Sequence, residues 1–132
     1  MHKILQPDSW KPPIGYANGV LAEGKQIYVA GQIGWTADSK MISSDLVDQV
    51  KQALQNIVDV LNEGDAQPAH VTRMTWFVTD KKEYLAKAKE IGQAYREVFG
   101  KHFPAMSLVQ VADLLEDDAK VEIEATAVIP SE

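Results

Sequence analysis

The stretch HVTRMTWFVT at residues 70–79 decides the fold. It is dense in β-branched and aromatic residues, which favour a strand. Side chains of a strand alternate between its two faces, and here the apolar ones occupy both. One face carries Thr72, Met74, Trp76 and Val78, and the other carries Val71, Thr75 and Phe77, with Arg73 as its interruption. Because apolar surface is stable only out of water, this strand needs cover on both sides.

Two amphipathic segments flank this strand. Residues 44–63 repeat apolar side chains at steps of three and four, which predicts a helix, and Gly64 is suited to a left-handed residue after its last turn. Residues 80–99 have the same periodicity, and Asp80 is a suitable N-cap. The sequence therefore predicts one helix before and one helix after the strand at 70–79.

The remaining segments alternate like strands. They cover residues 16–22, 26–33, 106–114 and 120–129. Glu23-Gly24-Lys25 predicts a hairpin turn between the first two, with Gly24 supplying a positive φ. The predicted order is β-β-α-β-α-β-β.

This order predicts an α+β fold in which a mixed sheet carries two helices on one face. Two helices cannot also cover the second face, which is apolar in the strand at 70–79 and in much of 26–33. Self-association is the simplest cover for such a face, so we expect a homo-oligomer.

Composition bounds the class of protein. The chain has 132 residues and a mass of 14.6 kDa, with 45% hydrophobic and 24% charged residues, as expected of a single globular domain over residues 1–132. The absence of cysteine excludes disulfides, thiolate metal sites and a cysteine nucleophile. The net charge of −6 disfavours nucleic acid and anionic membranes as partners. Without a targeting signal or a membrane-length apolar run, a cytoplasmic location is expected.

Few residues of the sequence suggest chemistry. Glu122 and Glu124 share one face of the last strand, about 6–7 Å apart. Such a carboxylate serves as a general acid or base when its surroundings allow, but a solvated strand face is the commoner situation. Trp35 lies in a loop, where a large aromatic often marks a contact surface, which is either the substrate pocket or a subunit interface. The three histidines have no metal-ligand spacing, so no metal site is expected.

Several segments together resemble the Rid family, also called YjgF or reactive intermediate deaminase proteins. They are Ile14-Gly15-Tyr16 with Gly19-Val20, Val29-Ala30-Gly31-Gln32-Ile33, Thr75-Trp76-Phe77-Val78-Thr79-Asp80, Phe103-Pro104-Ala105, and Val121-Glu122-Ile123-Glu124-Ala125 with Ala127-Val128. Their order and spacing agree from about residue 7 to residue 129. The resemblance implies a chorismate mutase-like fold, a barrel-like homotrimer and ligand clefts between adjacent subunits. It also implies cofactor-free hydrolysis of enamines and imines, such as 2-aminoacrylate and its imine tautomer, to 2-keto acids and ammonia.

The resemblance assigns roles to particular residues. The family's cleft tyrosine corresponds to Tyr16, and its strand signature corresponds to Ala30, Gly31 and Gln32, where the Gly31 backbone lines the pocket. The glutamate that orients water corresponds to Glu122. The resemblance thus favours a functional Glu122, whereas Glu124 keeps a surface role.

One position departs from the family. Deaminating members have Pro-Ala-Arg, whose arginine clamps the substrate carboxylate, but here the triplet is Pro104-Ala105-Met106. A thioether makes none of the charge-assisted bonds of a guanidinium. Arg73 and Arg96 do not map to the clamp, and Gly92 stands where many members carry an asparagine. We therefore expect a pocket suited to a less anionic or more apolar ligand, and weak activity on amino-acid-derived imines.

Three functions follow from these residues. The leading hypothesis is a protein that acts on or binds a small enamine, imine or carbonyl metabolite, with a substrate range altered by Met106. The alternative is a non-catalytic metabolite-binding or regulatory module that uses the same inter-subunit cleft. The third is an endoribonuclease or translation inhibitor, as attributed to some family members, which the acidic charge disfavours.

Overall fold

The computed structural model describes residues 1–131 of the chain. The elements in chain order are β1 (Lys3–Leu5), β2 (Gly19–Leu21), β3 (Gly24–Gln32), α1 (Leu46–Glu63), a 3₁₀ turn (Pro68–His70), β4 (Val71–Val78), α2 (Lys81–Ala86), α3 (Ala88–Phe99), β5 (Ala105–Gln110) and β6 (Val121–Pro130). All of the predicted helices and strands have a counterpart, while β1 was not expected.

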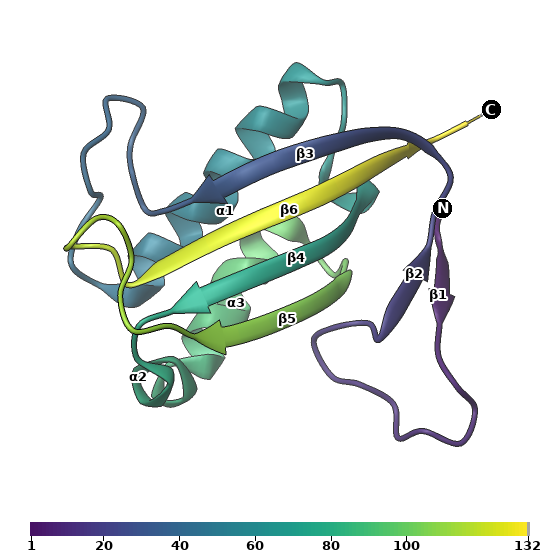
Figure 1. Ribbon diagram of the computed structural model, residues 1–132, viewed down its shortest axis with the longest axis horizontal. Helices are drawn as coiled ribbons and strands as arrows, with labels where there is room; N and C mark the ends of the chain where they lie inside the picture. The colour runs from purple at the N-terminus through teal and green to yellow at the C-terminus, as the bar shows by residue number, and fades with distance from the viewer. Residues whose placement is uncertain (132) are drawn as a thin grey trace.

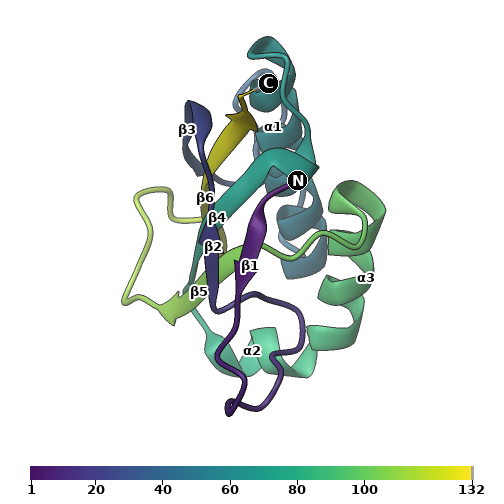
Figure 2. The same ribbon diagram turned by 90° about the vertical axis from the view of Figure 1, so that its right-hand side faces the viewer.

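The main sheet has the order β3-β6-β4-β5. β6 runs antiparallel to both β3 and β4, whereas β4 and β5 are parallel, so the sheet is mixed. Figures 1 and 2 show α1 and α3 against one face, and no helix of residues 1–131 lies on the other. The predicted α+β architecture with both helical segments on one face is confirmed.

The core lies between the helices and this face of the sheet. Val121, Ile123 and Ala127 of β6 are buried there, together with Met74 and Trp76 of β4. The apolar stripe of α1 packs onto them, because its side chains recur once per helical turn.

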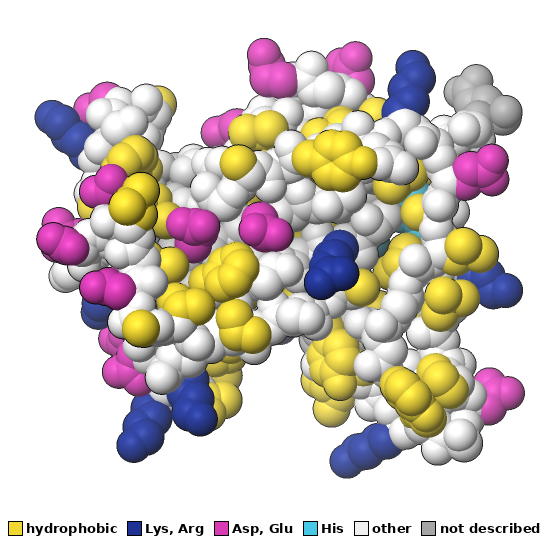
Figure 3. All heavy atoms as spheres, in the orientation of Figure 1, with side chains coloured by type: hydrophobic (Ala, Val, Ile, Leu, Met, Phe, Trp, Pro, Cys, Tyr) yellow, Lys and Arg dark blue, Asp and Glu magenta, His cyan; other side chains and the backbone are white. Residues whose placement is uncertain are grey.

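The second face of the sheet is open within the protomer. Tyr28 is 71% exposed and Val109 is 43% exposed on it, and Glu122 and Glu124 project from β6 on the same side. Figure 3, which looks onto this face, shows hydrophobic side chains beside acidic ones. The loop over residues 111–120 projects from this side (Figure 2).

The predicted hairpin at Gly24 is wrong. β2 pairs with β1 in a separate two-stranded ribbon, and Gly24 is the first residue of β3. Glycine is nevertheless required at this position, because its φ is 147° and an added Cβ would lie 2.7 Å from the carbonyl carbon of Ile129. The glycine at this position reflects a close approach between two strands rather than a tight turn.

Smaller differences concern the ends of elements. Gly64 has a φ of −100°, and the left-handed residue is Asp65, with a φ of 61°. The helix predicted over 80–99 is divided at Lys87 into α2 and α3. β5 ends at Gln110, four residues before the predicted end of that strand. Val71 is buried in the core rather than placed on the open face, because the register between β4 and β6 shifts between Val71 and Arg73.

Candidate functional site

Glu122 on β6 lies beside Gly31 on the neighbouring strand β3. Between Val29 and Gln32 the register of β3 against β6 shifts by one residue, which is a β-bulge. Simple alternation places Gly31 on the core side with Val29, but the bulge turns it toward the open face. A Cβ added at Gly31 would lie 2.7 Å from Cδ of Glu122. The carboxyl group therefore occupies the space that glycine leaves free.

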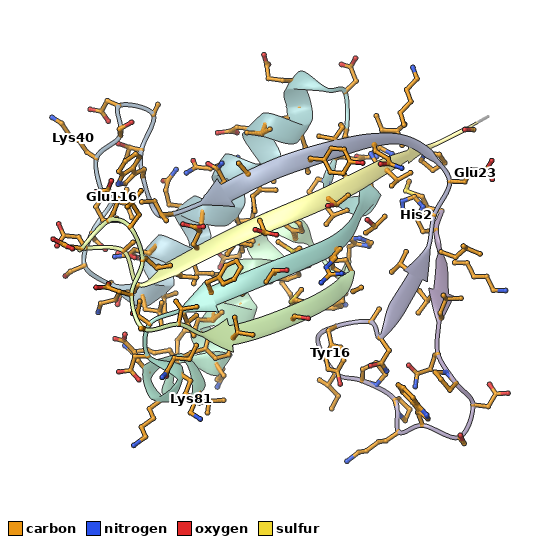
Figure 4. All side chains as sticks on the ribbon, in the orientation of Figure 1. His2, Tyr16, Glu23, Lys40, Lys81 and Glu116 are labelled. Atoms are coloured by element: carbon orange, nitrogen blue, oxygen red, sulfur yellow. The ribbon has the colours of Figure 1, made fainter. Side chains whose placement is uncertain are left out.

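A depression of about 330 Å³ surrounds this pair. Gln32 and Trp35 also line it, as do Ile33, Leu115 and Glu116. Figure 4 shows Glu116 on the loop between β5 and β6, beside the loop that carries Lys40. Four of the residues expected at the site thus lie together. Their depression holds two carboxylates, and no described cation lines it.

Gln32 and Ala30 are joined by a local hydrogen bond. The side-chain amide of Gln32 donates to the carbonyl of Ala30 over 3.1 Å. The Ala30 side chain is exposed on the open face and does not line the depression. Ala30 is therefore placed to orient Gln32 through its backbone.

Tyr16 and Met106 lie elsewhere, in a second pocket of about 650 Å³ between β5, α3 and the N-terminal segment. The bridge between Ala17 and Ala105 holds this segment beside the start of β5, where Figure 4 labels Tyr16. Met106 is the neighbour of the buried Met74 on the parallel strand, so its side chain faces the helices. We call this space the aromatic pocket, since Trp76, Tyr84, Tyr95 and Phe103 also line it.

The expected site is therefore divided within one protomer. Glu122 projects from the open face of the sheet, whereas Met106 projects from the face that carries the helices. The sheet itself separates the two side chains, so one small ligand does not contact both Glu122 and Met106 of the same chain.

One residue of the aromatic pocket was missed from the sequence. Arg96 on α3 lines the pocket beside Met106 and Tyr16. Gly92, one turn earlier, leaves room for it, because a Cβ there would lie 3.3 Å from the Arg96 Nη1 atom. The sequence held a signal for this placement. Arg96 follows Gly92 by four residues, and residues four apart lie on the same face of a helix.

Three histidines gather at one end of the sheet. The Nδ1 atom of buried His70 accepts the backbone N–H of Gln67 over 3.0 Å. Desolvation lowers the pKa of His70, and the neighbouring His2 and His102 lower it further.

No group of three or more His, Asp or Glu residues in the described chain is arranged to hold a metal ion. Among residues 1–131, no helix has the length and apolar character needed to cross a membrane.

Comparisons with known proteins place this fold and these motifs. A family described as Endoribonuclease L-PSP matches residues 8–129. The human 2-iminobutanoate/2-iminopropanoate deaminase is 30% identical over 114 residues, which are 86% of this chain and 79% of that protein. The Rid-family protein YyfB from Yersinia pestis has a TM-score of 0.86 at 29% identity, with 97% of this chain and 98% of that chain covered. TdcF of E. coli, solved with bound serine, has a TM-score of 0.69 at 31% identity, with 96% and 98% covered. The chain belongs to the Rid (YjgF) family and has its fold.

Proposed function

We propose that this protein hydrolyses a small imine or enamine to a carbonyl compound and ammonia, with a substrate range altered by Met106. The observation that carries the proposal is the placement of Glu122 over the Gly31 backbone at the rim of a depression. The deaminase named among the relatives supports the reaction class.

Glu122 supplies the proton transfers. Its carboxylate takes a proton from a water molecule as the oxygen attacks the imine carbon, which forms a carbinolamine. The proton passes to the nitrogen, which completes the neutral carbinolamine. The carboxylate then takes the hydroxyl proton and delivers it to the nitrogen, so that the C–N bond breaks and ammonia leaves as the carbonyl forms. An enamine first becomes the imine by protonation at carbon. These steps balance with water as the only co-reactant, so the proposal needs no cofactor.

One substrate molecule can contact both the depression at Glu122 and the aromatic pocket only where two copies of the chain meet. The depression at Glu122 carries negative charge, and the aromatic pocket carries the positive charge of Arg96. We propose that the open faces associate in a homotrimer, so that the depression of one copy and the aromatic pocket of the next form one cleft. This arrangement also covers Tyr28 and Val109, which are exposed in the single chain.

Met106 sets which substrates bind well. Without a guanidinium at this position, a short 2-imino acid finds no bidentate partner on β5. The surrounding side chains are apolar and aromatic. Substrates with a larger apolar body are therefore favoured over the imine of alanine.

The test is an assay in which an amino-acid oxidase generates imines from phenylalanine or from alanine. We expect the protein to accelerate keto-acid release from the phenylalanine imine and to act only weakly on the alanine imine. Glu122→Gln should lower the phenylalanine rate at least about 100-fold, as is usual for loss of a general acid–base group. Glu124→Gln is the matched control, because Glu124 is exposed on the same face of the same strand. Equal rates for Glu122→Gln and the parent protein would exclude this mechanism.

A second candidate is a metabolite-binding module without catalysis. The division of Glu122 and Met106 between two sheet faces favours it, since binding at the aromatic pocket alone needs no carboxylate. In that case Glu122→Gln leaves ligand binding unchanged and no imine is turned over. RNA cleavage stays disfavoured by the net charge of −6, although the matching family bears that description.

A further inference from the structure

The aromatic pocket has one charged residue. Its described lining is apolar or aromatic apart from Arg96, in a chain whose net charge is −6. The Arg96 side chain is exposed and forms no ion pair with any carboxylate among residues 1–131. A guanidinium without an ion-pair partner offers two parallel N–H donors to a carboxylate, and the apolar walls beside it suit the rest of such a ligand.

The walls of the pocket define the rest of the ligand. Tyr95 stacks on Phe103 with ring centroids 5.4 Å apart, and Trp76 meets Tyr84 edge-on at 6.4 Å. The Tyr95 hydroxyl already donates to the carbonyl of His102, so it presents its ring rather than a free donor. Flat apolar groups suit such walls. The volume of about 650 Å³ falls in the usual range for small-molecule sites.

Trp76 belongs to the same wall. It is 3% exposed, and its Nε1–H has no hydrogen-bond partner among the described residues. This nitrogen is itself fully buried, so a ligand in the pocket would contact the indole ring rather than bond to its N–H.

We propose that Arg96 binds the carboxylate of an aromatic 2-oxo or 2-imino acid whose ring lies among the aromatic side chains of this pocket. Arg96 on α3 supplies the cation that β5 lacks at Met106, and Gly92 leaves room for its guanidinium. The proposal deepens the proposed function, on which it rests for the imino group, by naming the substrate class. It makes Arg96 a specificity-determining residue.

The experiment uses 3-phenylpropionate, an aromatic carboxylate with no imine or carbonyl to react, and measures its binding by calorimetry. We expect Arg96→Gln to weaken binding at least tenfold. Lys89→Gln is the matched control, because it removes a positive charge from an exposed position of the same helix outside the pocket. The neutral amide of the same acid should bind weakly and respond little to Arg96→Gln. The Trp76 indole N–H resonance should shift on binding in the parent protein.

Each outcome decides the proposal separately from catalysis. No binding of 3-phenylpropionate to the parent protein, equal binding by Arg96→Gln, or an equal loss in Lys89→Gln overturns it. Propionate binding as tightly as 3-phenylpropionate also overturns it, because the aromatic walls would then contribute nothing. If Arg96→Gln loses binding while no imine is hydrolysed, the role of Arg96 stands and the deaminase reaction fails. If imines are hydrolysed and Arg96→Gln binds normally, the reaction stands and the role of Arg96 fails.

Discussion

The carboxyl group of Glu122 fills the space above Gly31 in which any other residue would place its side chain. The first prediction is that Gly31→Ala displaces this carboxylate, because the added methyl group would lie 2.7 Å from Glu122 Cδ. The end of a glutamate side chain moves easily, so the protein should fold. Imine turnover should fall at least about tenfold, which is a barrier change of about 1.4 kcal/mol.

The control for this variant is Lys25→Ala, since Lys25 is exposed on the same strand far from the depression. Rates are compared in the oxidase-coupled assay, and circular dichroism checks the fold. A Gly31→Ala protein that is folded and fully active would show that the Glu122 carboxylate has no fixed place in the reaction.

The second prediction concerns Met106. Met106→Arg should bind pyruvate at least tenfold more tightly than the parent, because a second guanidinium joins Arg96 in the aromatic pocket. The pocket opens to solvent, so the longer side chain can keep its charge hydrated. Met106→Leu controls for the changed shape. Calorimetric titration in which the arginine and leucine variants bind pyruvate equally would remove the explanation based on the missing clamp.

The site could be predicted from the sequence only in pieces. The motif at Gly31 and the carboxylate of Glu122 were expected together, and they lie together. Strand alternation alone places Gly31 on the wrong face, because the extra residue of a β-bulge has no clear sequence signal. Arg96 does not align with the clamp position in the sequence, yet α3 brings its side chain to the same pocket from another direction.

The third prediction is self-association through the open face. At micromolar concentration, sedimentation should find a species about three times the 14.6 kDa of one chain. Val109→Lys should shift it toward the monomer, since it places a charge where we expect apolar contact. Val60→Lys is the control, because Val60 is 39% exposed on α1, on the helical side. A monomeric parent protein would contradict both the trimer and the shared cleft.

The fold was predictable where burial patterns are regular and less so where the chain makes a close approach. The apolar stripe of α1 and the alternation of β6 both appear as expected. By contrast, β1 over Lys3–Leu5 is short and exposed, so its sequence has no apolar pattern to identify it. Its pairing with β2 depends on a long-range contact that no local propensity encodes.

The fourth prediction follows from Gly24. Gly24→Ala should destabilise the fold by more than the roughly 1–3 kcal/mol of a strained φ, because its Cβ would also meet the backbone of Ile129. Backbone atoms paired in a sheet cannot move aside cheaply. Gly100→Ala separates the two effects, as Gly100 has a φ of 69° and open space around it. In urea unfolding, the free energy of unfolding should be clearly lower for Gly24→Ala than for Gly100→Ala. Equal values would show that the close approach of Gly24 to Ile129 adds nothing to the cost of the substitution.

The fifth prediction is a pH dependence that His70 creates. Because desolvation and two neighbouring histidines lower its pKa in the folded state, the unfolded chain binds more protons between that lowered value and about 6.5. The free energy of unfolding is therefore fully developed above about pH 6.5 and declines as the pH falls through the lowered folded pKa. Protonation also removes the acceptor at Nδ1 that the Gln67 N–H uses. His70→Asn keeps an acceptor near that position but cannot titrate, so the loss of stability between pH 7.5 and 5.5 in urea unfolding should be smaller than in the parent protein. The same loss in both proteins would assign the acid sensitivity to groups other than His70.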